Sequence, residues 1–374
     1  MSEIATNIAV KLIQRASVTP EDGGCQNYIE SLLAPLGFVR TSVDAGGVTN
    51  SIYVRPGELK GTLAYAGHTD VVPTGPVEQW PHPPFAGTIE NGLLHGRGAQ
   101  DMKAGIACWI AAVADLCGEY TPLPTIQLLI TSDEEGDSID GTIRIVEQLQ
   151  ENDNLPDAVI VGEPSSFKHV GDTIRRGRRG VVQVKASFHG KQGHSAYPQD
   201  ADNAIHHAAP ALASIAAIDW GIPIDGFPPT SCQITNVNGG TGATNVIPGS
   251  WEALIDIRYN PGNNFNGIKS AIETVCADCD VTLEFDHSAI AFSTPDGPFL
   301  DLVSAGIKRV TGINTVRDTG GGTSDGRFLA AAGVPVAELG LTNSTIHQIG
   351  ECVAVRELVM LTKIYIDIIE NFEV

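Results

Sequence analysis

The sequence contains no run of about 18 apolar residues, so we expect no transmembrane helix. Its first ten residues include no basic segment followed by a long apolar stretch, and we therefore expect no signal peptide. Basic residues are also scarce, because 23 Lys and Arg stand against 44 Asp and Glu, giving a net charge of −21. Nucleic acids and anionic membranes bind positively charged surfaces, so this acidity argues against both as partners.

The cysteines do not form the pattern of a disulfide framework. There are seven of them, an odd number, and they are spread along the chain. This usage is typical of reduced thiols in a cytosol. Cys276 and Cys279 match a C-x-x-C pattern, but no second ligand pair or redox context accompanies them. We therefore predict a cytoplasmic protein with free thiols.

The length and the order of elements predict two domains. A chain of 374 residues exceeds a typical single domain. The first 175 residues or so alternate helix-like and strand-like segments, which is typical of an α/β domain with a largely parallel sheet. Residues 179–289 instead follow the order βαββαβ, the ferredoxin-like arrangement. We predict a discontinuous α/β catalytic domain, residues 1–178 and 290–374, with a mostly parallel mixed sheet flanked by helices and interrupted by an inserted dimerisation domain.

Hydrophobic periodicity gives the elements that position the motifs. The expected helices are 4–16, 28–33, 103–116, 203–218, 265–276, 298–310 and 355–369. The expected strands are 62–66, 125–130, 158–161, 181–189, 231–238, 251–259, 281–285 and 334–339.

Imidazole and carboxylate side chains recur where buried strands are expected to end. Catalytic groups in open α/β sheets gather outside the carboxyl ends of the strands. Two imidazoles and three carboxylates form a mixed nitrogen and oxygen ligand set, typical for zinc and similar first-row ions. The five predicted ligands are His68, Asp101, Glu135, Glu163 and His347. Singly, each would more often be a structural histidine or a solvated acid, so the prediction rests on their combination.

This ligand set is large enough for two metal ions. Two ions about 3.5–4 Å apart usually share a bridging carboxylate. We predict that His68 and Glu163 bind one ion, that Glu135 and His347 bind the other, and that Asp101 lies between them. The cofactor is then two Zn²⁺, for which Co²⁺ or Mn²⁺ can substitute because the same ligands accept several metals.

Two further acids complete the predicted chemistry. Asp70 lies two residues after His68, so on an extended segment it can accept the other imidazole N–H and fix the tautomer. Glu134 and Glu135 are neighbours and cannot both point at one ion from the same direction. We predict Glu135 as the ligand and Glu134 as the general base that takes a proton from metal-bound water. The water attacks a carbonyl carbon, and the proton passes to the departing nitrogen.

The local strings around these residues are distinctive. They are Gly-His-Thr-Asp-Val-Val-Pro at 67–73, the segment 96–103, Asp-Glu-Glu-Gly at 133–136 and Gly-Glu-Pro at 162–164. The chain resembles the zinc aminoacylase/carboxypeptidase superfamily of di-metal amidohydrolases. Further segments narrow the resemblance to members that remove a succinyl group from diaminopimelate: 176–180, 190–198, 227–231, 242–249, 321–328 and 343–347. One departure, Gln100 before Asp101, leaves the chemically essential positions intact.

The resemblance implies hydrolysis of N-succinyl-LL-2,6-diaminopimelate to succinate and LL-2,6-diaminopimelate, a step of lysine and cell-wall precursor synthesis. It also implies a homodimer joined through the inserted domain. His194 and Asn245 of that domain are then expected to reach the partner subunit's active site and stabilise the tetrahedral oxyanion.

The substrate carries several carboxylates, so its pocket should offer guanidinium and backbone N–H donors. Arginine provides a bidentate fork that lysine cannot copy. The predicted substrate-binding residues are Arg178, Arg258, Thr323 and Asn343. We interpret the neighbouring arginines 175, 176 and 179 as surface charges near a hinge.

Two alternatives remain open at this point. One is a related N-acyl amino acid deacylase such as an acetylornithine deacetylase, whose substrate lacks the succinyl carboxylate. The other is a catalytically inactive metal-binding or ligand-binding homologue, against which the presence of Glu134 argues.

Overall fold

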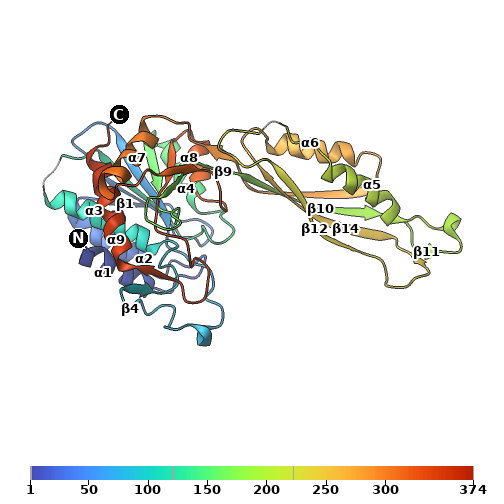
Figure 1. Ribbon diagram of the computed structural model, residues 1–374, viewed down its shortest axis with the longest axis horizontal. Coiled ribbons are helices and arrows are strands. Elements are labelled where there is room, and N and C mark those ends of the chain that lie inside the picture. Colours follow the sequence, from blue (N-terminus) through green and yellow to red (C-terminus); the bar gives the residue numbers. More distant parts are fainter. Residues whose placement is uncertain (1, 120–121, 222, 374) are drawn as a thin grey trace. The chain divides into compact units, whose positions relative to one another are not determined.

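The structure is a computed structural model that describes residues 2–119, 122–221 and 223–373. The described residues form two compact units (Figure 1). The first unit lies within residues 1–177, 294–318 and 324–374, and the second within 178–293 and 319–323. The roles predicted for the two parts of the chain, catalysis and dimerisation, stay predictions.

The first unit is built on a mixed sheet. Over the described residues its strand order is β1 (Val39–Ser42), β2 (Ser51–Arg55), β6 (Thr125–Thr131), β3 (Thr62–His68), β7 (Ala158–Val161), β18 (Val336–Glu338), β8 (Thr173–Arg175) and β17 (Val316–Asp318). The pairs β3–β6, β3–β7, β7–β18 and β8–β17 are parallel. The pairs β1–β2, β2–β6 and β8–β18 are antiparallel. The predicted mostly parallel mixed sheet is confirmed.

Helices pack against this sheet because its central strands are apolar on both faces. One hydrophobic cluster joins alternate residues of β6, Ile126, Leu128 and Ile130, to a set of helices. That set is α1 (Ser2–Ile13), α2 (Cys25–Leu33), α3 (Lys103–Gly118), α7 (Pro298–Thr311) and α9 (Val355–Glu370). The helices α4 (Thr142–Glu151) and α8 (Gly326–Ala331) lie outside the cluster and contact β6 and β18.

Short elements complete the first unit. The strands β4 (Thr88–Glu90), β5 (Leu93–His95) and β19 (Cys352–Ala354) form a small antiparallel sheet. The 3₁₀ turns are η1 (Ala34–Leu36) and η2 (Val77–Gln79).

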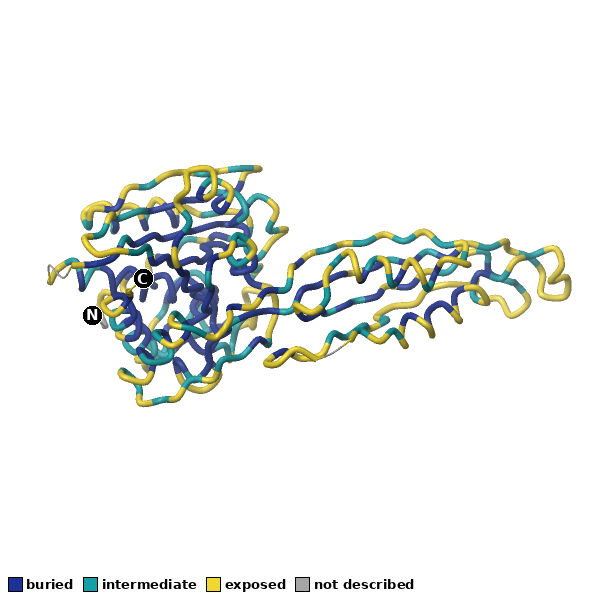
Figure 2. Tube along the Cα trace, turned by 90° about the horizontal axis from the view of Figure 1, so that it is seen from above, coloured by how far each residue is buried: buried dark blue, intermediate teal, exposed yellow. Residues whose placement is uncertain are grey.

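The second unit has the predicted ferredoxin-like order. Its antiparallel sheet runs β12 (Ser231–Gly239), β14 (Ser250–Tyr259), β10 (Gly180–His189) and β15 (Val281–Ala289). The helices α5 (Ala204–Ala216) and α6 (Phe265–Val275) cover one face. Along β10, buried Val182 and Val184 alternate with exposed Gln183 and half-buried Lys185, the pattern of a sheet covered on one side (Figure 2).

The remaining elements of this part of the chain are short. They are β9 (Gly177–Arg178), β11 (Gly193–His194), β13 (Val246–Ile247), β16 (Phe292–Ser293) and η3 (Pro198–Asp200). Within the described ranges, every helix is too short or too polar to cross a membrane.

Candidate metal centre

The five predicted ligands all lie in the first unit, at strand ends and in the loops that follow them. His68 is the last residue of β3, and Glu163 lies two residues after β7. Glu135 is in the loop after β6, Asp101 lies two residues before α3, and His347 is in the loop between β18 and β19. Because β6, β3 and β7 are parallel neighbours, their carboxyl ends meet at one edge of the sheet.

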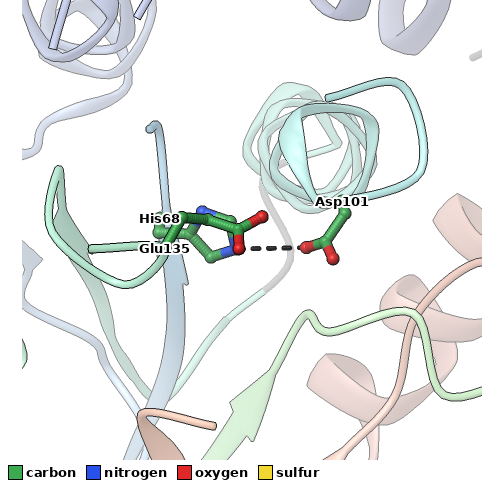
Figure 3. Close-up of side chains that lie close together, drawn as sticks. All are labelled: His68, Asp101 and Glu135. Atoms are coloured by element: carbon green, nitrogen blue, oxygen red, sulfur yellow. Dashed lines mark hydrogen bonds and ion pairs between the residues drawn. The ribbon is translucent and has the colours of Figure 1, made fainter. Parts of the chain in front are cut away.

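Asp101 lies between the two imidazoles. Its Oδ1 is 3.2 Å from Nε2 of His68, and its Oδ2 is 3.5 Å from Nε2 of His347. Figure 3 shows the side chains of His68, Asp101 and Glu135 facing one another. One carboxylate thus offers a separate oxygen to each histidine, which is the arrangement expected of a bridging ligand.

His68 is held in the tautomer that a metal ligand needs. Its Nδ1–H donates to the backbone carbonyl of Asp70 at 2.9 Å, so in the neutral ring the lone pair lies on Nε2. This Nε2 faces oxygens of Asp101 at 3.2 Å and Glu163 at 3.5 Å. A lone pair and two carboxylates repel one another at such distances unless a proton or a metal ion lies between them. His68 is only 1% exposed, so little water reaches them.

His347 is more open but has the same kind of surroundings. Its side chain is 50% exposed, and its Nε2 lies 3.0 Å from Oε1 of Glu135. Hydrogen bonds to Asp101 and Glu135 raise the pKa of this imidazole to about 10. The backbone of His347 has φ +60°, a left-handed conformation that is uncommon outside glycine and often occurs at functional sites.

Two of the acidic groups, Glu134 and Glu163, carry more negative charge than the protein around them neutralises. Burial, followed by the charge of Asp101, raises the pKa of Glu163 to about 7. Burial and the charge of Glu163 raise the pKa of Glu134 well above its usual range. The pKa of His68 is also well above its ordinary value, because hydrogen bonds to Asp101, Asp70 and Glu163 outweigh the effect of burial. All these shifts favour added positive charge, so the donor set fits divalent cations.

Among the described residues, two groups of three side chains each bring their possible ligand atoms within 4.8 Å of one another. They are His68–Asp101–Glu135 and His68–Glu134–Glu163. The ion pairs divide the ligands differently, with His68 next to Glu163 and His347 next to Glu135, both flanking Asp101. The ion pairs are direct contacts, 3.5 Å between His68 and Glu163 and 3.0 Å between His347 and Glu135, and they include His347. Glu134 nevertheless lies close enough to the site for proton transfer or for ligation.

Asp70 contacts both His68 and the loop after β6. Its carboxylate is 3.5 Å from Nδ1 of His68, and its backbone carbonyl is closer to the same nitrogen, at 2.9 Å. The two carboxylate oxygens also accept the backbone N–H groups of Glu134, at 3.3 Å, and Glu135, at 3.0 Å. Asp70 therefore holds the loop that carries the predicted base and one predicted ligand.

The sequence analysis missed a buried ion pair between Arg97 and Glu351, 2.8 Å apart. Glu351 lies four residues after His347, and Arg97 four residues before Asp101. A buried guanidinium group needs an acidic partner. Arg97 lies in a glycine-rich segment next to a predicted ligand, and this position could have indicated that such a partner exists.

His194 and Asn245 are brought together in the second unit, although 50 residues separate them in sequence. β11 pairs with β13, which places His194 opposite Val246, and the N–H of Ser195 donates to the carbonyl of Asn245 at 3.0 Å. Both residues are exposed.

The predicted substrate-binding residues are divided between the units. Arg178, Arg258 and Thr323 belong to the second unit, and Asn343 to the first. Arg178 is buried, and its Nη1 donates to the carbonyls of Gly320 at 3.0 Å and Gly322 at 3.4 Å. Nε of Arg258 donates to Asp256 at 2.8 Å.

A family model, peptidase family M20/M25/M40, matches residues 64–371. The chain belongs to this family. Succinyl-diaminopimelate desuccinylase from Halorhodospira halophila is 45% identical to it, over 97% of this chain and 97% of that protein. The desuccinylase from Thioalkalivibrio sulfidiphilus is also 45% identical, over 98% of each.

Solved structures share the fold. Aminopeptidase PepT from Bacillus cereus superposes with a TM-score of 0.81 at 22% identity, over 99% of this chain and 98% of that one. A dinuclear metal-binding M20 peptidase from Bacillus subtilis gives 0.70 at 17% identity, over 99% and 97%. At these identities the likeness shows the fold alone, and the activity is argued from the site and the closer relatives.

Proposed function

We propose that the chain hydrolyses the amide bond of N-succinyl-LL-2,6-diaminopimelate to succinate and LL-2,6-diaminopimelate, a reaction of lysine and cell-wall precursor synthesis. The observation that carries the proposal is the position of Asp101 between His68 and His347. It occurs in a chain that is 45% identical, over almost the whole length, to succinyl-diaminopimelate desuccinylases.

The residues that would hold two zinc ions are His68 and Glu163 for one, Glu135 and His347 for the other, and Asp101 for both. Bound ions would polarise the amide carbonyl and lower the pKa of water. In the chain itself, Asp101 and Glu135 orient His347, while the Asp70 carbonyl orients His68.

Glu134 is the proposed general base. In the described part of the chain, no donor hydrogen-bonds its carboxylate, whereas Glu135 already contacts His347. Glu134 takes a proton from the attacking water as the new carbon–oxygen bond forms. It then gives this proton to the nitrogen as the carbon–nitrogen bond breaks. The carboxylic acid formed in this way loses the second proton of the water, which the amine takes up, so the products are the succinate carboxylate and the ammonium form of the amine.

His194 and Asn245 are the proposed donors to the oxyanion of the tetrahedral intermediate. Nδ1 of His194 accepts the N–H of Ala196 at 3.0 Å, so the neutral ring carries its proton on Nε2 and can donate it outward. We propose that both side chains act in the site of a partner subunit of a homodimer. The free edge of β12, with exposed Val237, supports the second unit as the dimer contact.

Arg178, Arg258, Thr323 and Asn343 are proposed to bind the substrate's carboxylates. Buried Arg178 is supported best, since two loop carbonyls fix the direction of its guanidinium group. The expected compartment is the cytoplasm.

The test is hydrolysis of N-succinyl-LL-diaminopimelate by metal-stripped protein, before and after stepwise zinc addition. Activity should return with about one to two equivalents of zinc. N-acetylornithine is the matched control substrate, because it lacks the succinyl carboxylate. Faster turnover of N-acetylornithine would overturn the proposed specificity but keep the mechanism. Absence of activity on any acyl amine, with zinc bound, would overturn the proposed function.

A further inference from the structure

The buried carboxylate of Glu351 fixes the segment that leads to Asp101. Its Oε2 accepts Nη1–H of Arg97 at 2.8 Å and the backbone N–H of Gly98 at 3.1 Å. Its Oε1 accepts the backbone N–H groups of Gln100 at 2.8 Å and Asp101 at 3.3 Å. The side chains of Arg97 and Glu351 are 2% and 1% exposed. The position of Asp101 is thus set by a residue of the loop that carries His347.

Gln100 also connects the segment before Asp101 to the loop that carries His347. Its Oε1 accepts both the backbone N–H of Thr345, at 2.8 Å, and the hydroxyl of Thr345, at 2.6 Å. Its Nε2 donates to Oγ1 of Thr342 at 3.2 Å. The side chain of Gln100 is buried, so these bonds are made without competition from bulk water.

Arg97 extends the connection to the backbone of His347 itself. Its Nη2 lies 3.4 Å from the carbonyl of His347, and its Nη1 donates to the carbonyl of Gln348 at 3.2 Å. His347 is half exposed and sits in a loop without regular secondary structure. The imidazole is held by Glu135 and Asp101, and the bonds from Arg97 hold the backbone that carries it.

We propose that Gln100, together with the Arg97–Glu351 pair, positions Asp101 relative to His347 and so sets the affinity for the metal ion that these two residues would share. The inference rests on the proposed di-metal function. It adds a role for Gln100, which precedes Asp101 in the sequence. These are positioning residues, because they act through Asp101 and His347. Ligands that are already held in place need less ordering when the metal binds.

The test compares zinc binding by the full chain with that of three variants. Gln100→Met keeps the side-chain length but removes every hydrogen bond of the amide. Thr345→Val removes the hydroxyl bonded to Gln100 and to the backbone of Cys352, and Thr345→Ser restores a hydroxyl. Gln14→Met is the matched control, since the exposed amide of Gln14 donates to the carbonyl of Ala86 at 3.1 Å on the surface.

Competition titration with a zinc chelator should resolve two affinities in the unaltered protein. Gln100→Met and Thr345→Val should weaken binding of the ion held by His347 roughly 10- to 100-fold, and should affect the other ion, which shares only Asp101, much less. Thr345→Ser and Gln14→Met should match the unaltered protein. The absorption bands of the Co²⁺-loaded protein should change in the same two variants, because these bands depend on ligand geometry.

The outcomes separate the two proposals. If the unaltered protein binds no zinc, the proposed function fails. If it binds two ions and Gln100→Met binds both with the same affinities, only the positioning role fails. Equal weakening of both ions, with a lower melting temperature, would make Gln100 a general structural residue and would also overturn the inference.

Discussion

Oδ2 of Asp70 accepts the backbone N–H of Glu135 at 3.0 Å. This bond joins the segment after β3 to the segment after β6, and a second bond to the N–H of Glu134 reinforces it. Asp70 is fully buried, so neither bond competes with solvent. The carboxylate therefore determines where a predicted ligand and the predicted base lie.

We expect Asp70→Asn to lower kcat/KM because its amide N–H₂ cannot accept the second backbone N–H. Leaving a buried donor unpaired costs about 1–3 kcal/mol. If this cost destabilises the conformation in which Glu134 and Glu135 are correctly placed, kcat/KM drops roughly 10- to 100-fold. Asp157→Asn is the matched control, since Asp157 accepts the N–H of Thr62 at 2.7 Å at the other end of β3. Equal losses in both variants would contradict a specific role for Asp70.

Glu134→Gln should remove the general base and keep its shape. Turnover should fall roughly 10²- to 10⁴-fold, the range typical of general-base catalysis. Metal content, measured by atomic absorption, should stay at the level of the unaltered protein. A parallel loss of metal would make Glu134 a ligand, as its position in the His68–Glu163 group also permits.

Zinc affinity should rise with pH because protons compete for His347. Its imidazole pKa, raised from 6.5 to about 10 by Asp101 and Glu135, keeps it protonated in the metal-free protein at neutral pH. Zinc needs the neutral ring, so binding must release this proton. Between pH 6.5 and 9 we expect the affinity to increase by about tenfold per pH unit for each proton released.

Calorimetry in buffers of different ionisation enthalpy would measure this proton release, and His347→Gln should reduce it. Absence of buffer dependence would contradict the prediction. The same raised pKa stabilises the metal-free fold fully below pH 6.5, and this contribution is lost as the pH rises through about 10. The melting temperature of metal-free protein should therefore carry a His347-dependent decrease over that interval.

Periodicity predicted the elements that carry the site, but not all of their neighbours. β3, β6 and β7 are mostly apolar, and α3 and α9 are long enough to show a repeat. The sequence analysis proposed no element for α8, which has six residues, or for β1, whose residues are mostly exposed. Neither carries a clear hydrophobic period. It also left α4 unassigned, although that helix has four buried residues.

In the site, too, some features could be predicted from the sequence and others could not. Ligand residues directly after apolar strands could be predicted, because a strand end fixes where the next side chain lies. The bonds of Gln100 to Thr345 could not, since 245 residues separate the two. Only the folded chain brings such pairs together, and no local pattern reports them.

Gly162→Ala should disturb the site through packing. A Cβ at this position would overlap the hydroxyl of Tyr65 and lie 2.6 Å from Cε of Met102. Tyr65 stacks on Trp109 with ring centroids 5.0 Å apart, so it has little room to move. Glu163 must therefore shift, and we expect a loss of about 1–3 kcal/mol in stability, the usual cost of overpacking. Denaturant unfolding and zinc titration would measure both effects.

Gly118→Ala is the matched control for this variant, because an added Cβ there meets no atom within 4 Å. If Gly162→Ala retained both stability and zinc affinity, the close packing of Gly162 against Tyr65 would not constrain Glu163.

His194→Ala should lower kcat roughly 10²- to 10³-fold, the usual effect of losing one oxyanion donor. Zinc binding should not change, since His194 belongs to the second unit and all predicted ligands belong to the first. His206→Ala, which removes another exposed histidine of the second unit, should retain full activity.

Mixing subunits tests whether His194 acts across the proposed dimer. His194→Ala and Glu134→Gln are each expected to be nearly inactive alone. In a mixed dimer, the subunit with intact Glu134 receives His194 from its partner, so one of its two sites is complete. Random exchange at equal amounts should then restore about a quarter of the unaltered activity. Recovery after mixing would require a shared site, whereas no recovery, with exchange verified by mass spectrometry of the mixed dimer, would place the action of His194 within its own chain.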